Sequence, residues 1–234
     1  MYFDWTYVVL VLPAVIFALI ASARVKSTYN KYSTVRSASG ITGAQAARRI
    51  LEANGLGHVQ IEHVSGSLTD HYDPKANVIR LSDSVYDNSS TAAVGIACHE
   101  VGHALQYAND YQPIKLRTAI IPVTQIGSKL AIPLVLIGLV LNSFSGSFLS
   151  VAYLGIILFG LCTLFQLLTL PIEYNASNRA MEQIRSRGLL MEDEMQGVKA
   201  VLNAAALTYV ASLAVSLMQL LRLIALVGGR RSRN

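Results

Sequence analysis

Charged residues are scarce in this 234-residue chain. They make up 14% of the sequence, whereas a typical soluble domain has about 25%. Hydrophobic residues account for 53%, and the mean hydropathy is +0.43. This balance argues against an ordinary soluble protein and predicts a membrane protein. The length is sufficient for one modest soluble domain and a few spanning helices.

Cysteine is also nearly absent. Cys98 falls in a predicted helix and Cys162 in an apolar run. Two cysteines in such different segments do not indicate a disulfide framework. We therefore expect both to be small buried apolar residues.

Positive charge is in excess, but not in the manner of a nucleic-acid-binding protein. The formal net charge is +5, and the sequence contains no RNA-binding or DNA-binding motif. The basic residues gather beside apolar segments, at 24–31 and 230–233, where Lys and Arg typically face anionic lipid and the cytoplasm. The expected partners therefore include a lipid bilayer and exclude nucleic acid.

The first apolar run, residues 7–23, has no Lys or Arg before it. A secretory signal peptide has a basic region there, whereas this chain has Asp4 and Trp5. A retained transmembrane helix fits better, with Trp5 and Tyr7 at one interface and Arg24 at the other.

Three more apolar runs follow. Residues 142–146 are too few to form more than a turn between antiparallel helices. Gln125 and Lys129 interrupt the second run, and Gln219 and Arg222 interrupt the last one. Whether the last run crosses the membrane completely is left open. The predicted parts are transmembrane helix 1 at 1–23, a mixed α+β part at 24–117, transmembrane helix 2 at 118–142, transmembrane helix 3 at 147–170, a polar helical part at 171–203, and transmembrane helix 4 at 204–228.

The polar stretch after the first span predicts a mixed α+β unit. Its predicted elements are helices at 42–54 and 92–107 and strands at 59–63 and 76–82. Thr42 and Gln45 have the spacing of a capping box at the start of the first helix. The strand around Val78 to Leu81 has two interpretations, a sheet edge that pairs with an extended peptide or a plain core strand.

The second of these helices contains His99-Glu100-Val101-Gly102-His103, an H-E-x-x-H motif. Residues four apart share one helix face, so His99 and His103 can offer imidazole nitrogens to one metal ion. Glu100 is turned by about 100° from His99, where it can reach a metal-bound water. Zinc lowers the pKa of that water, and the carboxylate can take its proton as the water attacks a carbonyl. The alternative is a coincidental pair of helical histidines.

A catalytic zinc site needs a third protein ligand, and the spacing alone leaves this ligand open. The longer H-E-x-x-H-x-x-G-x-x-H pattern is absent because Asn109 occupies its last position. Glu173 is the best candidate, since it begins a polar helix directly after an apolar run. A favourable charge near a helix N-terminus explains its position equally well.

Four segments carry a family resemblance that extends over nearly the whole chain. They are Leu68-Thr69-Asp70-His71-Tyr72-Asp73-Pro74, the block from His99 to Gln106, Leu170-Pro171-Ile172-Glu173-Tyr174-Asn175-Ala176-Ser177, and Val201-Leu202-Asn203-Ala204-Ala205-Ala206-Leu207-Thr208-Tyr209-Val210. On these segments the chain resembles the YugP-like membrane zinc metallopeptidases and, more distantly, the HtpX-like membrane proteases.

The resemblance implies a gluzincin-like site with one Zn²⁺ ion. In HtpX-like enzymes the third zinc ligand is a Glu in an E-[FY]-x-A-D segment, and the matching residue here is Glu173. The Asp of that segment orients a zinc-binding His, and Ser177 stands in its place, so that a hydroxyl would accept the hydrogen bond. Asp70 or Asp73 is an alternative source of that support. Asn175 is a further candidate for contact with the ligands or the substrate.

His71 has two interpretations. In the first, it stabilises the oxyanion or binds the substrate. In the second, it caps the turn before the second strand, and we favour this one.

The motif helix is expected at the membrane surface, since polar residues flank it on both sides and its apolar part is too short for a span. The predicted fold is therefore a mainly α membrane protein with about four transmembrane helices and a small α+β zincin-like domain at the membrane surface. The positive-inside rule places the basic segment after the first span, and with it the site, in the cytoplasm. The expected localisation is a multi-pass protein of the cell membrane. Four full crossings would leave Arg230, Arg231 and Arg233 outside, against the same rule.

The predicted function is a membrane-embedded zinc metallopeptidase that hydrolyses peptide bonds with a water activated by Glu100. Its partner would be a polypeptide substrate, with membrane proteins as one candidate class. The main alternative is a non-catalytic zinc-containing membrane scaffold or partner subunit, although closed structural zinc sites are rich in Cys. A transporter is less consistent, because the apolar runs lack paired carboxylates.

Overall fold

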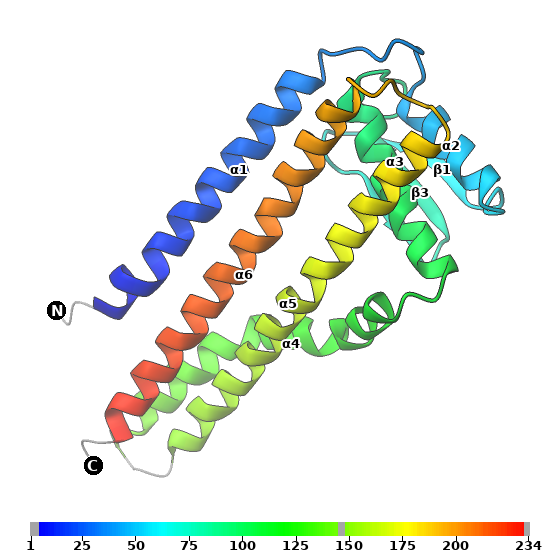
Figure 1. Ribbon diagram of the computed structural model, residues 1–234. Helices are drawn as coiled ribbons and strands as arrows, with labels where there is room; N and C mark the ends of the chain where they lie inside the picture. Colours follow the sequence, from blue (N-terminus) through cyan, green and yellow to red (C-terminus); the bar gives the residue numbers. More distant parts are fainter. Residues whose placement is uncertain (1–4, 145–147, 232–234) are drawn as a thin grey trace. The chain divides into compact units, whose positions relative to one another are not determined.

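The computed structural model describes residues 5–144 and 148–231. The fold is mainly α, with four long apolar helices and one small sheet, as the sequence predicts (Figure 1). In chain order the elements are the π-helical turn η1 (Tyr7–Val11), α1 (Leu12–Tyr32), α2 (Gly43–Ala53), β1 (Gln60–Val64), β2 (His71–Asp73), β3 (Val78–Ser82), α3 (Thr91–Ala108), α4 (Gln112–Leu141), α5 (Leu149–Ser186) and α6 (Met195–Arg231).

The described chain divides into two compact units. The membrane unit contains the described residues up to 21, residues 115–170, and those from 208 onward. The motif unit contains residues 22–114 and 171–207, including the H-E-x-x-H segment. Each boundary falls inside a long helix, because hydropathy changes along these helices while the backbone hydrogen bonding continues.

Four helices are long and apolar enough to cross a membrane. They are Tyr7–Tyr32, Gln112–Leu141, Leu149–Ser186 and Met195–Gly229. The last apolar run, whose crossing the sequence left open, therefore belongs to a helix of sufficient length. The helices extend beyond the predicted boundaries, with α1 reaching Tyr32 and α4 starting at Gln112. The predicted turn at 142–146 falls partly on residues 145–147, which lie outside the described residues.

Small residues allow α4 and α5 to pack closely within the membrane unit. A Cβ atom added to Gly138 would lie 2.8 Å from the Cα atom of Ala152. A Cβ atom added to Gly155 would lie 2.6 Å from the carbonyl oxygen of Ala131. Helices in lipid associate mainly through such close packing, because lipid tails remove the hydrophobic driving force.

In the motif unit, α2 begins and packs as the sequence predicts. The hydroxyl of Thr42 accepts a hydrogen bond from the backbone N–H of Gln45, and the Gln45 side chain accepts one from the N–H of Thr42. This capping box satisfies two N–H groups that the first turn of a helix leaves unpaired. One face of α2 is then buried, through Ala46, Ala47, Ile50 and Leu51.

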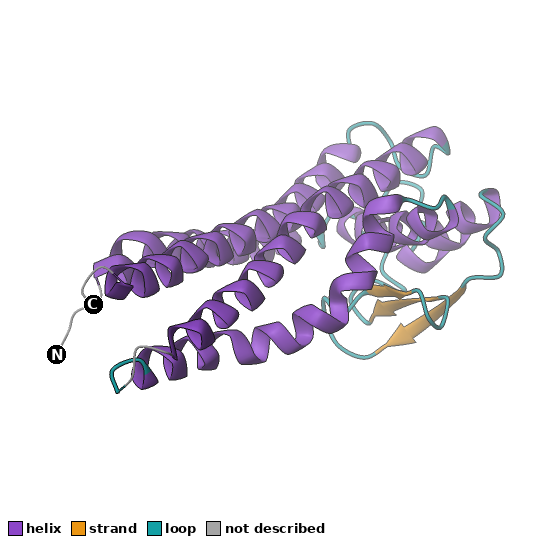
Figure 2. Cartoon of the chain, turned by 90° about the horizontal axis from the view of Figure 1, so that it is seen from below, coloured by secondary structure: helices purple, strands orange, loops and turns teal. Residues whose placement is uncertain are grey.

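The sheet has the strand order β1-β3-β2, with β1 parallel and β2 antiparallel to β3. Figure 2 shows this sheet in orange. The strand β3 is therefore central, and the interpretation of this strand as a sheet edge that pairs with a peptide is wrong. The strand β2 was not predicted, because the sequence indicated a turn at these residues. With only three residues, His71-Tyr72-Asp73, β2 is too short to show an alternating pattern, and its pairing with β3 defines it.

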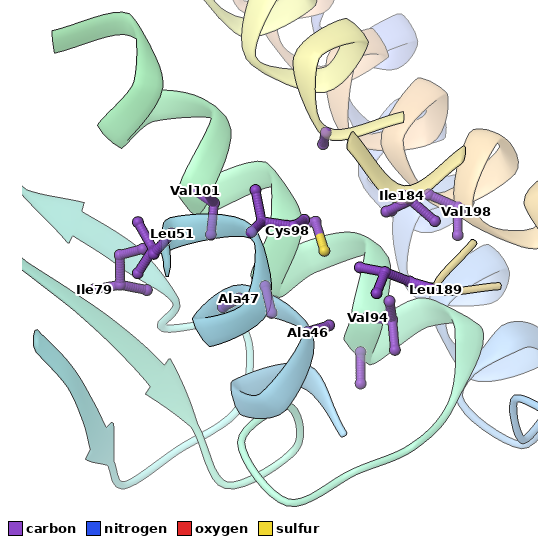
Figure 3. Packing of buried hydrophobic residues seen from close by; sticks show 14 of the residues in the cluster. Ala46, Ala47, Leu51, Ile79, Val94, Cys98, Val101, Ile184, Leu189 and Val198 are labelled. Carbon is purple, nitrogen blue, oxygen red and sulfur yellow. The ribbon is translucent and has the colours of Figure 1, made fainter. Parts of the chain in front are cut away.

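The helix α3 lies in the core of the motif unit. Its N-terminus is capped by Ser90, whose hydroxyl accepts a hydrogen bond from the N–H of Ala93. Figure 3 shows its residues Val94, Cys98 and Val101 within a cluster of apolar side chains. The cluster also includes Ala46, Ala47, Leu51, Ile79, Ile184, Leu189 and Val198. The expected burial of Cys98 is confirmed, whereas Cys162 is only partly buried.

The helix α5 does not end at Pro171. Proline removes one helical N–H donor and usually kinks or breaks a helix, and the sequence predicts that the third span ends just before this residue. The two compact units do divide between Leu170 and Pro171, but the helix itself does not end there. Instead α5 continues without interruption to Ser186, as Figure 1 shows. The residues that follow the proline include the buried Ile172, Glu173 and Ala176. Their packing in the motif unit offsets the missing hydrogen bond.

Candidate metal centre

The two motif histidines lie together on α3. They are four residues apart, and their ring centroids are separated by 4.8 Å with the ring planes at 85°. The side chain of His99 is 15% exposed and that of His103 is 14% exposed. The helix therefore presents two nearly perpendicular imidazoles in a sheltered position.

Glu173 on α5 completes a cluster with these histidines. Its Oε2 atom lies 3.3 Å from Nε2 of His99 and 3.5 Å from Nε2 of His103. Among the described residues, these three are the group whose ligand atoms could hold a metal ion, and the ligand atoms lie within 4.8 Å of one another. The structure thus brings together residues that are 70 and 74 positions apart in the sequence.

A glycine inside the motif permits this approach. A Cβ atom added to Gly102 would overlap the carbonyl oxygen of Ala176 and would lie 3.0 Å from its carbonyl carbon. The backbones of α3 and α5 therefore meet between His99 and His103 on one helix and between Glu173 and Ser177 on the other. Because α5 passes so close to Gly102, the Glu173 carboxylate reaches both imidazoles.

The donor set fits zinc. Two imidazole nitrogens and one carboxylate oxygen are the three protein ligands of a known class of catalytic zinc sites. Zinc bonds of about 2.0–2.1 Å in tetrahedral geometry place neighbouring ligand atoms about 3.3 Å apart. The two measured nitrogen–oxygen separations of 3.3 and 3.5 Å are close to this value.

The electrostatics of the cluster favour a cation. Burial acts to lower the pKa of His103, but the hydrogen bond to Glu173 and the charges of Glu100 and Glu173 outweigh it, so the pKa is raised in the absence of a metal ion. The negative environment that stabilises the protonated ring also stabilises a bound divalent cation, which must displace that proton.

Glu100 is buried but keeps its carboxylate free for other partners. Its residue exposure is 8%, and within the part of the chain that the structure describes, no hydrogen bond or ion pair of this carboxylate is found. Its carboxylate oxygens are not among the buried side-chain atoms that lack a hydrogen-bond partner in the described residues, so water can reach them. Glu100 is therefore placed beside the cluster and is not one of its three ligand residues.

Each imidazole contacts a further polar side chain through its Nδ1 atom. The Ser177 hydroxyl lies 3.1 Å from Nδ1 of His99, the contact that the family resemblance implies. The Gln106 side chain lies 3.0 Å from Nδ1 of His103. Asn175 does not touch either ring, but its Oδ1 atom accepts a hydrogen bond from Gln106.

Gln106 is a site residue for which the sequence analysis assigned no role. A usable signal was present, since Gln106 lies three residues after His103 on the same helix, in a run that is otherwise apolar. It is fully buried, and a buried amide requires hydrogen-bond partners.

The other sequence candidates lie elsewhere in the motif unit. The Asp70 carboxylate accepts hydrogen bonds from the backbone and hydroxyl of Ser82. Asp73 forms an ion pair with Arg80. His71 is on β2, where its ring contacts the carbonyl of Thr69 and the Arg80 guanidinium. These contacts order the sheet, and none of the three residues belongs to the ligand cluster.

Comparison with known proteins identifies a family for the chain. A family model described as "Putative neutral zinc metallopeptidase" matches residues 7–228. The "Putative membrane protease YugP" of Bacillus subtilis (strain 168) is 47% identical over 228 residues, which cover 97% of this chain and 99% of that protein. No solved structure gives a significant match. These matches confirm the family resemblance seen in the sequence.

Proposed function

Because the chain belongs to the family described as "Putative neutral zinc metallopeptidase", we propose that it is a membrane-bound zinc enzyme that hydrolyses peptide bonds. The observation that carries the proposal is the cluster of His99, His103 and Glu173 with Glu100 beside it. Three protein ligands leave one position of a tetrahedral zinc ion open, as catalytic sites require.

The zinc ion would be held by His99, His103 and Glu173. When bound, it supplies a water of lowered pKa and polarises the carbonyl of the substrate. Glu100 acts as the general base, because its carboxylate has no protein donor to satisfy and lies next to the ligand His99 in the sequence. It takes the proton from the attacking water and delivers it to the leaving amine. Ser177 and Gln106 hold the two imidazole rings at their Nδ1 atoms.

The substrate class is a polypeptide, and membrane proteins are the leading candidates for a protein with four helices long and apolar enough to cross a membrane. A non-catalytic zinc-containing scaffold is the alternative. It is less well supported, because it gives the buried Glu100 carboxylate no function and explains no observation better.

A Glu100→Gln variant tests the mechanism. Purified wild-type and variant proteins are loaded with zinc, and cleavage of unfolded polypeptides and of membrane proteins is followed beside the matched control Glu52→Gln, an exposed glutamate on α2. The amide keeps the shape and removes the base. We expect full zinc content and a loss of about 10²–10⁴-fold in cleavage rate. Cleavage by Glu100→Gln at the wild-type rate would contradict the general-base assignment.

We also propose that the site faces the cytoplasm. Six basic residues follow the first span, and none precedes it; they are Arg24, Lys26, Lys31, Arg36, Arg48 and Arg49. Ser67→Cys and Ser186→Cys place reporters on two exposed parts of the motif unit. Both should react with a membrane-impermeant thiol reagent only when it is applied to inside-out vesicles. Labelling of either position in intact cells would refute this orientation.

A further inference from the structure

We propose that Gln106 is a positioning residue that fixes the proton of His103 on Nδ1, so that Nε2 is free to bind the metal. This inference rests on the proposed zinc site. It assigns a role to a buried side chain that is not a ligand and that touches one ligand directly.

Gln106 makes three polar contacts, and they use its whole amide. Its side chain is fully buried. The Oε1 atom lies 3.0 Å from Nδ1 of His103. The Nε2 atom donates to the backbone carbonyl of Ile172 at 2.8 Å and to Oδ1 of Asn175 at 3.0 Å. An amide nitrogen has two protons, so both donors are used.

The donor and acceptor roles in this hydrogen-bonded cluster follow from the two groups at its ends, the Ile172 carbonyl and the Arg179 guanidinium. The carbonyl of Ile172 can only accept a hydrogen bond, and the guanidinium of Arg179 can only donate one. Arg179 donates through Nε to Oδ1 of Asn175 at 2.8 Å, so the Asn175 atom that faces Gln106 is an oxygen. Two acceptors therefore face the same end of the Gln106 amide, and that end must be the nitrogen. The other end, facing His103, must be the oxygen.

The consequence for His103 is a fixed tautomer. An amide oxygen only accepts, so the ring atom that faces it must carry the proton. The proton then resides on Nδ1, and the Nε2 atom, which lies 3.5 Å from Glu173, keeps its lone pair for the metal. The opposite tautomer would place two acceptors against each other in a buried position, which is strongly disfavoured.

The two ligand histidines differ in this respect. His99 faces the hydroxyl of Ser177, which can donate or accept. A hydroxyl therefore supports either tautomer of His99, whereas the amide of Gln106 supports only one of His103. In the zinc-free protein the Glu173 carboxylate, 3.5 Å from Nε2, also accepts a proton from the ring, so the choice that Gln106 imposes is complete only when a metal ion or the removal of that carboxylate takes this second acceptor away.

Nuclear magnetic resonance of histidine-labelled protein in detergent tests the assignment. The ring nitrogens are observed at alkaline pH, where the imidazole is neutral, in the zinc-free Glu173→Ala protein, which has no carboxylate facing Nε2 of His103. An added His103→Asn change identifies the His103 signals. We expect the proton on Nδ1 in the Glu173→Ala protein. We expect a mixture of tautomers when Gln106→Met, which has no acceptor at this place, is added to it.

Zinc affinity supplies a second measurement, by competition with a coloured chelator. Gln106→Met should bind zinc about 10–100-fold more weakly than the wild type, whereas Gln60→Met, at an exposed glutamine on β1, should not. A proton on Nε2 of His103 in Glu173→Ala would overturn the inference, and so would wild-type zinc affinity in a folded Gln106→Met protein. If Gln106→Met does not fold, the Glu173→Ala spectrum alone decides. A proton on Nδ1 in Glu173→Ala, together with a wild-type protein that binds no zinc, would refute the proposed metal centre and still support the tautomer.

Discussion

The close approach of α3 and α5 at Gly102 makes a quantitative prediction for Gly102→Ala. The added methyl group would overlap the carbonyl oxygen of Ala176 and would lie 3.0 Å from its carbonyl carbon and 3.1 Å from its Cα atom. These neighbours are helix backbone and cannot rotate away as a side chain can. The two helices must therefore separate locally.

The required separation can be compared with what a metal site tolerates. Carbon atoms in favourable contact are about 3.5–4.0 Å apart, so the backbone of Ala176 must move by about 0.5 Å or more. Metal–ligand distances tolerate only about 0.2 Å. Glu173 lies three residues before Ala176 on the same helix, so this shift displaces it from His99 and His103. Zinc affinity should fall at least about tenfold. This is the lower end of the loss in metal affinity that follows when groups that orient a metal ligand are disturbed.

The effect of the same change on folding should be smaller, because two contributions oppose each other. Overpacking costs about 1–3 kcal/mol, whereas alanine favours a helix over glycine by about 0.8–1.0 kcal/mol. The free energy of unfolding should therefore change by no more than about 2 kcal/mol. A variant that loses zinc while it stays folded would distinguish this mechanism from general destabilisation.

The assay combines zinc competition with thermal unfolding of the zinc-free protein. The matched control is Gly160→Ala on α5, where an added Cβ atom meets nothing within 4 Å. It should keep zinc affinity and stability. If Gly102→Ala binds zinc as tightly as the wild type, the helices can separate without disturbing the ligands and the reasoning is wrong.

Three further predictions concern single residues. Glu173→Gln should lower zinc content and abolish cleavage together, because a neutral amide is a poor zinc ligand. Glu192→Gln, which changes a residue in an exposed ion pair with Arg185, should do neither. Normal zinc content in Glu173→Gln would exclude Glu173 as a ligand. The hydrogen bond from Arg80 lowers the pKa of Asp73, so its contribution to stability is present above the unfolded pKa and is lost as the pH falls through the folded one. The unfolding temperatures of wild type and Asp73→Asn should therefore converge in acid, and a constant difference would contradict this. Burial raises the pKa of the Cys98 thiol, so that it should react with iodoacetamide only after unfolding, as mass spectrometry of the alkylated protein would show.

Local features of the sequence predicted the structure well. The pairing of His99 with His103 depends only on helical spacing, and the capping box of α2 depends only on Thr42 and Gln45. The expected helices and strands of the motif unit form close to their predicted positions for the same reason. Glu173 required the family resemblance, because spacing alone explained it equally well as a helix charge.

Features that depend on distant contacts escaped the sequence analysis. The role of Gly102 depends on Ala176, and the role of Gln106 depends on Ile172 and Asn175, all of them on another helix. The central position of β3 depends on strands that pair with it from both sides, one of them only three residues long. The continuation of α5 through Pro171 depends on the burial of the residues that follow it. Patterns within a short window do not contain this information.

The geometry of the site also limits how the sequence can change over evolutionary time. His99 with His103, and Glu173 with Ser177, are each separated by one helical turn on an unbroken helix. One inserted residue within either pair would rotate the second side chain by about 100° and move it by about 1.5 Å, and so would one deleted residue. The segment from Arg187 to Glu194 lies between two helices and has no such periodic constraint. Length variation among relatives should therefore be tolerated in that loop, whereas the number of residues within each ligand-bearing turn cannot change.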